Sequence, residues 1–492
     1  ECLHQTLEEL DLLLTGGRLG PAGKELLRGA YQAAEGGDQF KAAQQAAIMT
    51  AEFHTLGAPQ PQGPRALQPP KPTGEARSYR AVVMLFLHGG ADTFNMLVPL
   101  DCPLYDEYRQ VRKNVALLPG QLHRIATTGQ PCASFGVHSQ LPFIKELYDL
   151  GEAAFVSNIG SLVEPLTREE FRRGGARCAG LFSHSDQQQA AQTLRCQTAG
   201  ASSKGAGGRI ADALASGSQG FRTMSFSVAG SATWSQGIET SQEVIDRRGG
   251  TVRFEKREQL RTVVENITSV QHGNIYCEEY AQQLAQAVRF NEELEQQLRG
   301  AELKTAYLTE NEHLSMQLKQ VARLIAARGE RQAERDFFFV SLGGFDTHQS
   351  VARALDERFR QVNNALRSFV GELKAQGAFQ DTVLVTHSDF GRTLTPNGGD
   401  GTDHAWAGNH LVLGGAVRGG RVFNDFPTSL LEGSEQDAGR GRLIPKHPWE
   451  SVILPVAQWL GLEESQHGEV FPNLGNFNAS THLIHRASLF RS

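Results

Sequence analysis

No apolar run in the sequence approaches the roughly 20 residues that a helix needs to cross a bilayer, so we predict no transmembrane segment. An excess of positive charge is also missing. The chain has 48 Lys and Arg against 54 Asp and Glu, a formal net charge of −6, with both signs interspersed. Binding to nucleic-acid phosphates needs clustered Lys and Arg, so we expect no nucleic-acid partner.

Cysteine is scarce as well, with six residues in 492, too few for a disulfide scaffold. Cys178 and Cys196 flank one Gly-, Ser- and Gln-rich stretch. A disulfide between them and six separate, mostly buried thiols stay open as alternatives. The triplets 266–268 and 478–480 match the glycosylation acceptor pattern, and Glu1 follows no visible leader. We expect a processed chain or a piece of a longer one that is secreted, extracytoplasmic or in an organelle lumen.

The composition is otherwise that of a packed globular body, with 40% hydrophobic and 21% charged residues. Residues 1–57 predict two amphipathic helices punctuated by glycine pairs, which form a helical appendage. Residues 58–78 are rich in Pro and lack periodicity, which predicts an exposed linker. Residues 79–492 predict one domain, in which two long polar-rich helices occupy roughly 255–329.

Short apolar runs alternate with helical patterns through this domain. The runs AVVMLFLHGG, DFFFVSLGG and DTVLVTHSDFG predict buried strands that leave a sheet at glycine or polar residues. Such alternation predicts a doubly wound α/β fold with a mainly parallel sheet covered on both faces. In these sheets ligands bind outside the carboxyl ends of the strands.

Polar, ligand-type side chains follow three of the predicted strands. They are His88, Asp92, Thr93 and Asn95 after the first strand; Asp346 and His348 after the second; and His387, Asp389, Arg392, Asp403, His404 and His410 after the third. Because the three ends can converge on one edge of the sheet, they predict a metal site. Mixed imidazole and carboxylate ligands suit Zn, Mn or Fe, and an all-oxygen set would suit Mg or Ca.

Such a site is suited to the cleavage of phosphate or sulfate esters. Arg392 is suited to hold phosphate or sulfate bidentately, and a metal would polarise the P–O or S–O bond. The segment LFSHSDQQQ offers Ser183 as a nucleophile at a helix start, with Thr93 as second candidate. Other interpretations stay open: Ser183 as an ordinary helix cap, His387 as a core histidine, and Arg392 as the partner of a nearby carboxylate.

Several long motifs carry a resemblance to a known family. FLHGGADTFNMLVPL, FSHSDQQQAAQ, SLGGFDTHQS and VTHSDFGRTLTPNGGDGTDHAWAGNHLVLGGAVRGGRV occur in this order. The chain resembles, over roughly 79–478, the sulfatase-like family catalogued as domain of unknown function 1501, which is placed in the alkaline phosphatase superfamily.

The first 57 residues resemble a second family. LDLLLTGGRLG and IMTAEFHTLG are similar to the C-terminal end of the family catalogued as domain of unknown function 1800. This resemblance implies that the chain is the back half of a fusion. Its partner would be the preceding domain of that fusion, or another protein bound through the N-terminal helices.

The superfamily resemblance implies a doubly wound α/β core and divalent metal ions, up to two, at the strand ends. It implies a Ser, Thr or formylglycine nucleophile acting on phosphate or sulfate esters, including those of sulfated or phosphorylated glycans. Zinc, manganese, magnesium and calcium are not distinguished. The implied metal ligands are Asp92, Asp346, His348, Asp389 and His404, and the implied catalytic residues are Ser183, His184 and Arg392.

The chain also departs from the family pattern. His88 replaces the usual Arg, Thr93 the usual Gly, and Asp389 the usual Glu; Ser185 and Ala405 differ as well. The first hypothesis is a metal-dependent hydrolase of phosphate or sulfate esters. The alternative is a catalytically inactive, sulfatase-like protein that serves as a structural or assembly subunit, and a third hypothesis is a sulfated-glycan-binding module.

Overall fold

The protein divides into two compact units. The structure is a computed structural model that describes residues 2–56, 60–65, 77–197, 204–248, 250–251 and 257–491. The contacts group Glu1–Gly74 with Thr251–Arg299 in one unit, and Glu75–Gly250 with Gly300–Ser492 in the other. We call these the helical unit and the α/β unit. Much of the predicted linker at 58–78 lies outside the described residues.

The helical unit is assembled from two distant parts of the chain. Its elements are α1 (Cys2–Thr15), α2 (Pro21–Ala33), α3 (Gln39–Ile48), α4 (Ala51–His54), β1 (Pro61–Pro64), α10 (Arg257–Thr268), β10 (Val270–His272) and α11 (Ile275–Leu298). The first 57 residues therefore hold four helices, where the sequence predicted two. Val263 and Ile267 of α10 join Leu7, Leu10 and Leu27 in one core.

This packing separates residues 251–299 from the domain in which the sequence analysis placed them. The physical reason is that the apolar face of α10 completes the core of α1–α3, which the short helices cannot close by themselves. β1 pairs antiparallel with β10, and Arg65 forms an ion pair with Glu278 of α11.

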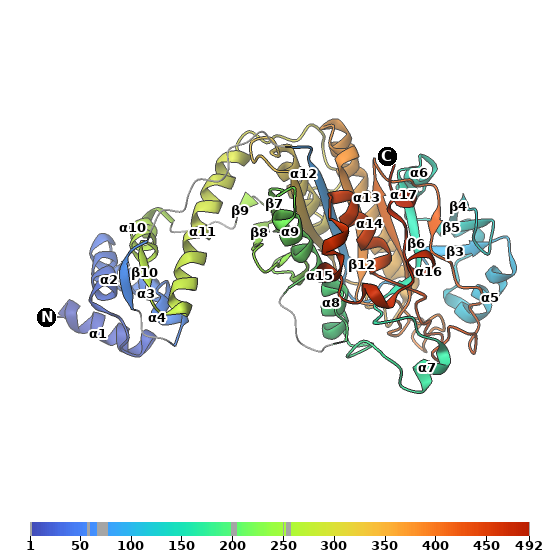
Figure 1. The fold of residues 1–492 in the computed structure, drawn as a ribbon, viewed down its shortest axis with the longest axis horizontal. Coiled ribbons are helices and arrows are strands. Elements are labelled where there is room, and N and C mark those ends of the chain that lie inside the picture. The colour runs from blue at the N-terminus through green and yellow to red at the C-terminus, as the bar shows by residue number, and fades with distance from the viewer. Residues whose placement is uncertain are drawn as a thin grey trace. The chain divides into compact units, whose positions relative to one another are not determined.

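A ten-stranded mixed sheet forms the centre of the α/β unit (Figure 1). Its strands are β2 (Arg80–Leu87), β6 (Ala153–Gly160), β7 (Thr223–Ser227), β8 (Gln242–Asp246), β9 (Gly250–Thr251), β11 (Arg335–Leu342), β12 (Thr382–Ser388), β13 (Gly408–Gly414), β14 (Val422–Phe423) and β15 (His447–Pro448). The order is β14-β6-β13-β12-β2-β11-β7-β8-β9, with β15 paired to β6. Most pairs are parallel, and β13 runs antiparallel to both neighbours.

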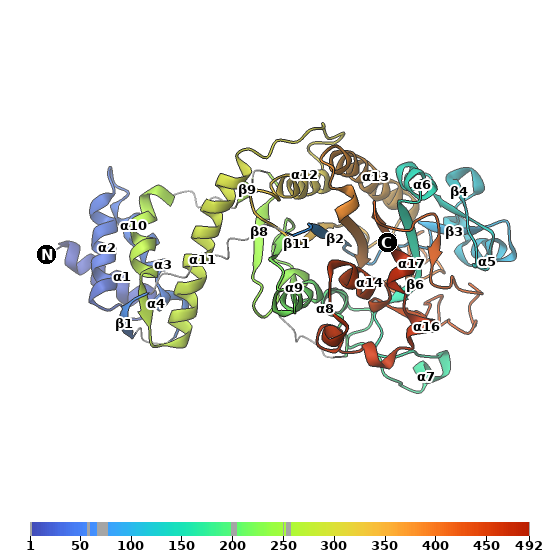
Figure 2. The same ribbon diagram turned by 45° about the horizontal axis from the view of Figure 1, so that its top comes forward.

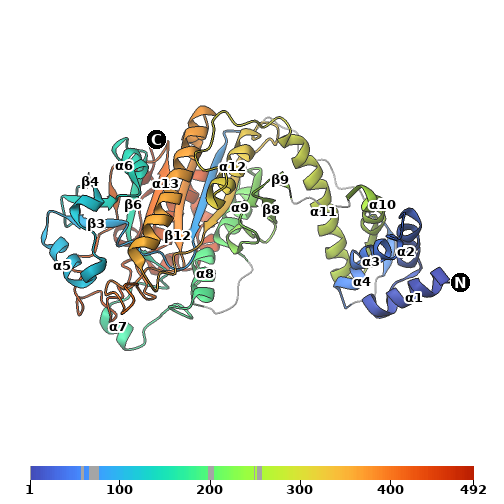
Figure 3. The ribbon, with the colours of Figure 1, turned by 180° about the vertical axis from the view of Figure 1, so that it is seen from behind.

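Helices cover both faces of this sheet, which confirms the predicted doubly wound α/β class. α6 (Pro142–Asp149), α12 (His313–Ala326) and α13 (Val351–Ala375) lie on one face, seen from the front in Figure 3. α8 (His184–Thr193), α9 (Ala206–Ser216) and α14 (Glu450–Leu460) lie on the other (Figure 2). Residues 255–329 contain three helices, α10 to α12, where the sequence predicted two.

A small antiparallel sheet and short helices complete the unit. The sheet has the order β3 (Leu97–Leu100), β5 (Ser134–His138), β4 (Leu122–Ala126). The remaining helices are α5 (Pro103–Arg112), α7 (Arg168–Arg172), α15 (His467–Val470), α16 (Ala479–His482) and α17 (Arg486–Leu489). Cys178 and Cys196 form the disulfide that the sequence left open, and Cys102 and Cys132 form a second one that it did not predict.

Three strands end side by side at the edge that carries the polar residues. β2 lies between β11 and β12 and runs parallel to both, so that Leu87 is level with Leu342 and Ser388. Gly89, at a φ of +116°, lets the first loop pass close to the second: a Cβ there would lie 2.3 Å from the backbone nitrogen of Asp346. The first loop therefore packs against the second, and the backbone N–H of Gly89 donates to Asp389 of the third.

Candidate metal centre

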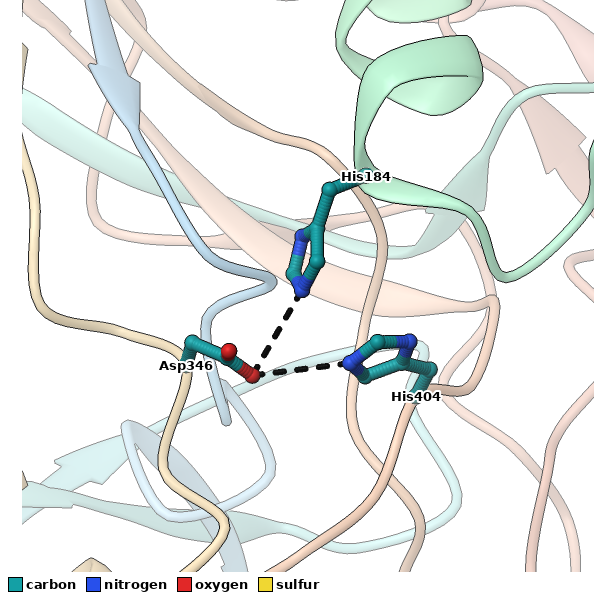
Figure 4. Close-up of side chains that lie close together, drawn as sticks. All are labelled: His184, Asp346 and His404. Carbon is teal, nitrogen blue, oxygen red and sulfur yellow. Dashed lines mark ion pairs between the residues drawn. The ribbon is translucent and has the colours of Figure 1, made fainter.

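Four side chains meet above this edge of the sheet. Asp346 and His348 come from the loop after β11, and His404 comes from the long loop after β12. His184 is the first residue of α8, whose contacts with β12 bring the start of the helix to the same place. Figure 4 shows His184 and His404 pointing at the carboxylate of Asp346.

The donor atoms of these side chains converge on one carboxylate oxygen. Asp346 Oδ1 lies 3.0 Å from His348 Nε2, 3.5 Å from His184 Nε2 and 3.5 Å from His404 Nε2. The Nε2 atoms of His348 and His404 are 3.0 Å apart. A tetrahedral ion with bonds of about 2.0–2.1 Å holds its donor atoms about 3.3 Å apart, which is close to these separations.

Each imidazole is fixed through its other nitrogen. His184 Nδ1 lies 2.7 Å from Asp389 Oδ2, and His348 Nδ1 lies 3.1 Å from Asp403 Oδ1. His404 Nδ1 lies 2.7 Å from the carbonyl oxygen of Phe182. Because these oxygens are acceptors, the neutral rings donate from Nδ1 and keep a lone pair on Nε2. Metal-binding histidines typically donate from the other ring nitrogen to a carboxylate or carbonyl oxygen in this way.

The surroundings of the cluster also favour a cation. His184 Nε2 is buried and has no hydrogen-bond partner among the described residues, although it is directed toward Asp346. Burial lowers the pKa of His404, which keeps this ring neutral. Three Nε2 lone pairs facing a carboxylate repel one another unless a cation or protons lie between them. Three imidazole nitrogens with one carboxylate oxygen suit zinc, or manganese or iron, better than magnesium or calcium. The residues present therefore fit a metal ion.

The centre is open to solvent on one side. The side chains of Asp346 and His348 are 46% and 45% exposed, and those of His184 and His404 are 30% and 24% exposed. Solvent therefore reaches the side chains of Asp346 and His348, whereas His184 Nε2 is itself buried.

Arg392 closes the inner side of the cluster. Its Nη1 donates to Asp346 Oδ1 at 2.9 Å and to the carbonyl of Gly89 at 3.2 Å, and its Nη2 donates to the carbonyl of Thr402. Burial raises the pKa of Asp346, but the hydrogen bond and charge of Arg392 outweigh it and hold this pKa below its usual value. The guanidinium of Arg392 thus bonds to protein groups. This agrees with the open alternative that Arg392 pairs with a nearby carboxylate and does not hold a substrate.

Asp92 and Asp389 lie outside the converging set. Asp92 is fully buried and forms an ion pair with Arg112 of α5, with 2.6 Å between Oδ2 and Nη2. Asp389 contacts His184 from behind and does not face Asp346. Among the described residues, the donor atoms of His184, Asp346 and His404 all lie within 4.8 Å of one another. His348 joins this group through Asp346 and His404, and Asp92 does not belong to it.

The two candidate nucleophiles have different surroundings. Ser183 is half-buried at the N-cap position of α8 and makes no capping bond; its Oγ lies 3.2 Å from that of Ser185. Thr93 is fully buried, and its Oγ1 accepts a hydrogen bond of 2.7 Å from the backbone of Asn409. His387 is a core histidine stacked on Trp449, with ring centroids 3.8 Å apart.

Sequence reasoning named Asp389 and Asp403 but missed Gln188 and the carbonyl of Phe182. Gln188 Nε2 donates to Asp389 Oδ2 at 2.9 Å, beside the bond from His184. The spacing of four residues between His184 and Gln188 in a predicted helix was the available signal, since such residues share a helix face. The carbonyl of Phe182 is a backbone group, so the residue type gives no sign that it accepts a hydrogen bond from His404.

Comparison with family models shows to which family the chain belongs. The model described as protein of unknown function (DUF1501) matches residues 180–433, just over half of the chain. The chain belongs to the DUF1501 family. The matched segment contains all four converging side chains, whereas Asp92 precedes it. A comparison with curated proteins found no match.

Solved structures were compared as well. The lipoteichoic acid synthase LtaP from Listeria monocytogenes is 9% identical, with 79% of this chain and 73% of that one covered and a TM-score of 0.33. The PsFucS1 sulfatase from Pseudoalteromonas sp. is 10% identical, with 84% and 72% covered and a TM-score of 0.33. The PH0037 protein from Pyrococcus horikoshii is 10% identical, with 82% and 100% covered and a TM-score of 0.27.

Proposed function

We propose that this DUF1501 protein is a metal-dependent hydrolase of phosphate or sulfate esters. The observation that carries the proposal is the convergence of three Nε2 atoms on Asp346 Oδ1. His184, Asp346, His348 and His404 would hold one divalent ion, for which zinc fits the donor set best. When bound, such an ion polarises an ester oxygen and lowers the pKa of a bound water.

The chain's own residues would prepare this centre. Asp389, Asp403 and the carbonyl of Phe182 hold the imidazoles with Nε2 toward Asp346 Oδ1. Arg392 fixes the Asp346 carboxylate from the buried side. Of the two hydroxyl candidates, the half-buried Ser183 beside His184 is the better placed, because Thr93 is enclosed.

The substrate and the location follow from the same proposal. The open side of the centre suits an ester on a large molecule, such as a sulfated or phosphorylated glycan. Two disulfides occur among the described residues, which is compatible with an oxidising compartment. This supports a secreted or lumenal protein. No helix among the described residues is long and apolar enough to cross a membrane.

Metal titration tests the proposal directly. Protein stripped with a chelator is titrated with Zn²⁺, Mn²⁺, Mg²⁺ and Ca²⁺ by calorimetry, and each loaded form is assayed on aryl phosphate and aryl sulfate esters. We expect one tight Zn²⁺ or Mn²⁺ site, turnover of one ester class, and loss of both in Asp346→Asn. The matched control is Asp425→Asn, which removes an exposed carboxylate paired with Lys446. A wild-type protein without metal affinity contradicts the proposal.

The pH dependence of metal affinity has a defined sign. Imidazoles bind metal only when neutral, so affinity falls as the pH drops below the ordinary histidine pKa of about 6.5. Burial lowers the pKa of His404, so this ring stays available to the metal at lower pH than an exposed one.

A structural or assembly role is the second candidate. The buried guanidinium of Arg392 already neutralises Asp346, so this carboxylate has a cationic partner without metal. The departures from the family pattern at His88, Thr93 and Asp389 point the same way. A protein that binds metal but hydrolyses neither ester class supports this role, and one that retains sulfated glycan without metal supports a binding module.

A further inference from the structure

Asp389 has the environment of an orienting carboxylate. It follows β12, its side chain is fully buried, and both oxygens accept hydrogen bonds. Oδ1 accepts from the backbone N–H of Gly89 at 3.1 Å. Oδ2 accepts from His184 Nδ1 at 2.7 Å and from Gln188 Nε2 at 2.9 Å. Both lone pairs of Oδ2 are therefore in use.

The ring of His184 separates Asp389 from the converging atoms. Its Nδ1 faces Asp389 Oδ2, and its Nε2 faces Asp346 Oδ1 at 3.5 Å. These two nitrogens lie on opposite sides of the imidazole. A metal held by Nε2 would thus have the ring between itself and Asp389.

The helix α8 supplies two donors to the same oxygen. His184 and Gln188 are four residues apart and lie on one face of the helix. The amide of Gln188 fixes Asp389 against the first turn of α8, so the carboxylate cannot rotate toward solvent without breaking this bond. Gln188 can then influence the metal only through Asp389 and His184.

We propose that Asp389, held by Gln188, is a positioning residue that fixes the tautomer and direction of His184, and that it is not a metal ligand. The inference rests on the proposed metal-dependent function, and it revises the ligand set that the family resemblance implied. A carboxylate that holds a metal-binding histidine in this way typically contributes about 10–100-fold to metal affinity.

Metal affinity in a graded set of variants tests the proposal. We expect Asp389→Ala to weaken Zn²⁺ binding by about 10–100-fold. Asp389→Asn keeps one acceptor oxygen and should lose less, and Gln188→Leu should lose the least. Asp346→Asn, which removes a ligand, should abolish tight binding. Cobalt-loaded Asp389→Asn should keep the visible absorption spectrum of the wild-type cobalt protein, because the ligands are unchanged. A changed spectrum, or a loss equal to that of Asp346→Asn, overturns the proposal.

A second readout needs no metal. In metal-stripped protein with ¹⁵N-labelled histidine, we expect His184 to carry its proton on Nδ1 in the wild type and in Gln188→Leu, and to lose this preference in Asp389→Ala. The same tautomer preference in all forms overturns the positioning role. Because this measurement is independent of loading, a wild-type protein that fails to bind metal contradicts the proposed function while leaving the role of Asp389 testable. Circular dichroism verifies that each variant is folded.

Discussion

The ends of β2 and β11 carry the same five-residue pattern, but the aspartates of the two patterns differ in burial. Both read Gly-Gly-x-Asp-Thr, at 89–93 and at 343–347, on neighbouring parallel strands. Asp92 is fully buried, whereas the side chain of Asp346 is nearly half exposed. The pattern therefore sets a backbone turn, and it does not decide what its aspartate does.

The partners of the two aspartates make the difference. Arg112 of α5 bonds Asp92 and also donates to the carbonyls of Thr393 and Leu394, which seals the first end. At the second end a buried arginine, Arg392, donates to Asp346 Oδ1, and three imidazole Nε2 atoms lie 3.0–3.5 Å from the same oxygen. The comparison supports a structural role for the first aspartate and is consistent with the ligand role proposed for the second.

Removing the charge of Asp92 should have the largest effect on stability. Asp92→Asn leaves the buried guanidinium of Arg112 without its counter-charge. Breaking a buried pair in this way typically costs about 3–5 kcal/mol of the free energy of unfolding. Urea or thermal denaturation of the metal-free protein measures the loss, and the melting temperature of the α/β unit should fall clearly.

The matching substitution at the other end provides the control. Asp346→Asn in metal-free protein should cost less than Asp92→Asn, because Asp346 is partly exposed, although it also removes the counter-charge of the buried Arg392. If both variants lose equal stability, or if Asp92→Asn loses metal while staying as stable as the wild type, the two ends do not differ as described.

Much of the fold could be predicted from the sequence. The apolar runs of β2, β11 and β12 are bounded by glycine or polar residues, and they alternate with helical patterns. The same signals placed Asp346, His348 and His404 at one edge. They could not separate Asp92 from Asp346, since both follow identical patterns. The separation depends on Arg112, which lies twenty residues later on α5 and has no local link to its partner.

The packing of the helical unit was harder to predict from the sequence. Residues 257–298 have helical spacing, but spacing does not say which core a helix joins. Val263 and Ile267 pack against Leu7 and Leu10, more than 250 residues earlier in the chain. Tertiary packing against α1–α3 selects this partner, and a single sequence does not show it.

Removing either disulfide should have an effect of intermediate size, and it tests the difference between the two strand ends. Cys102–Cys132 closes the loop that contains Arg112, and Cys178–Cys196 closes the loop that contains His184. Replacing either pair by serine should cost about 2–4 kcal/mol of stability through loop entropy. Only the loss of Cys178–Cys196 should also weaken metal binding, because it frees the segment that carries His184.

Calorimetric Zn²⁺ titration of both double variants, each below its own melting temperature, measures this contrast. Replacing Cys178 and Cys196 should weaken affinity by roughly tenfold, in the range of lost ligand orientation. The variant without Cys102 and Cys132 is the matched control and should bind as the wild type does. Equal weakening in both would show that the disulfides act on the whole unit and that neither end is separately stabilised.

Thr402 lies between the two ends and should give the smallest effect. Its Oγ1 is 3.3 Å from Asp92 Oδ2, 3.4 Å from Arg392 Nε and 3.4 Å from Thr347 Oγ1. Thr402→Val preserves shape and removes these long bonds, at a cost of about 1–2 kcal/mol in denaturation. If the ends are independent, Zn²⁺ affinity stays within about threefold of the wild type. A larger loss would mean that the structural aspartate and the ligand aspartate share one hydrogen-bond network, with Thr402 as its link.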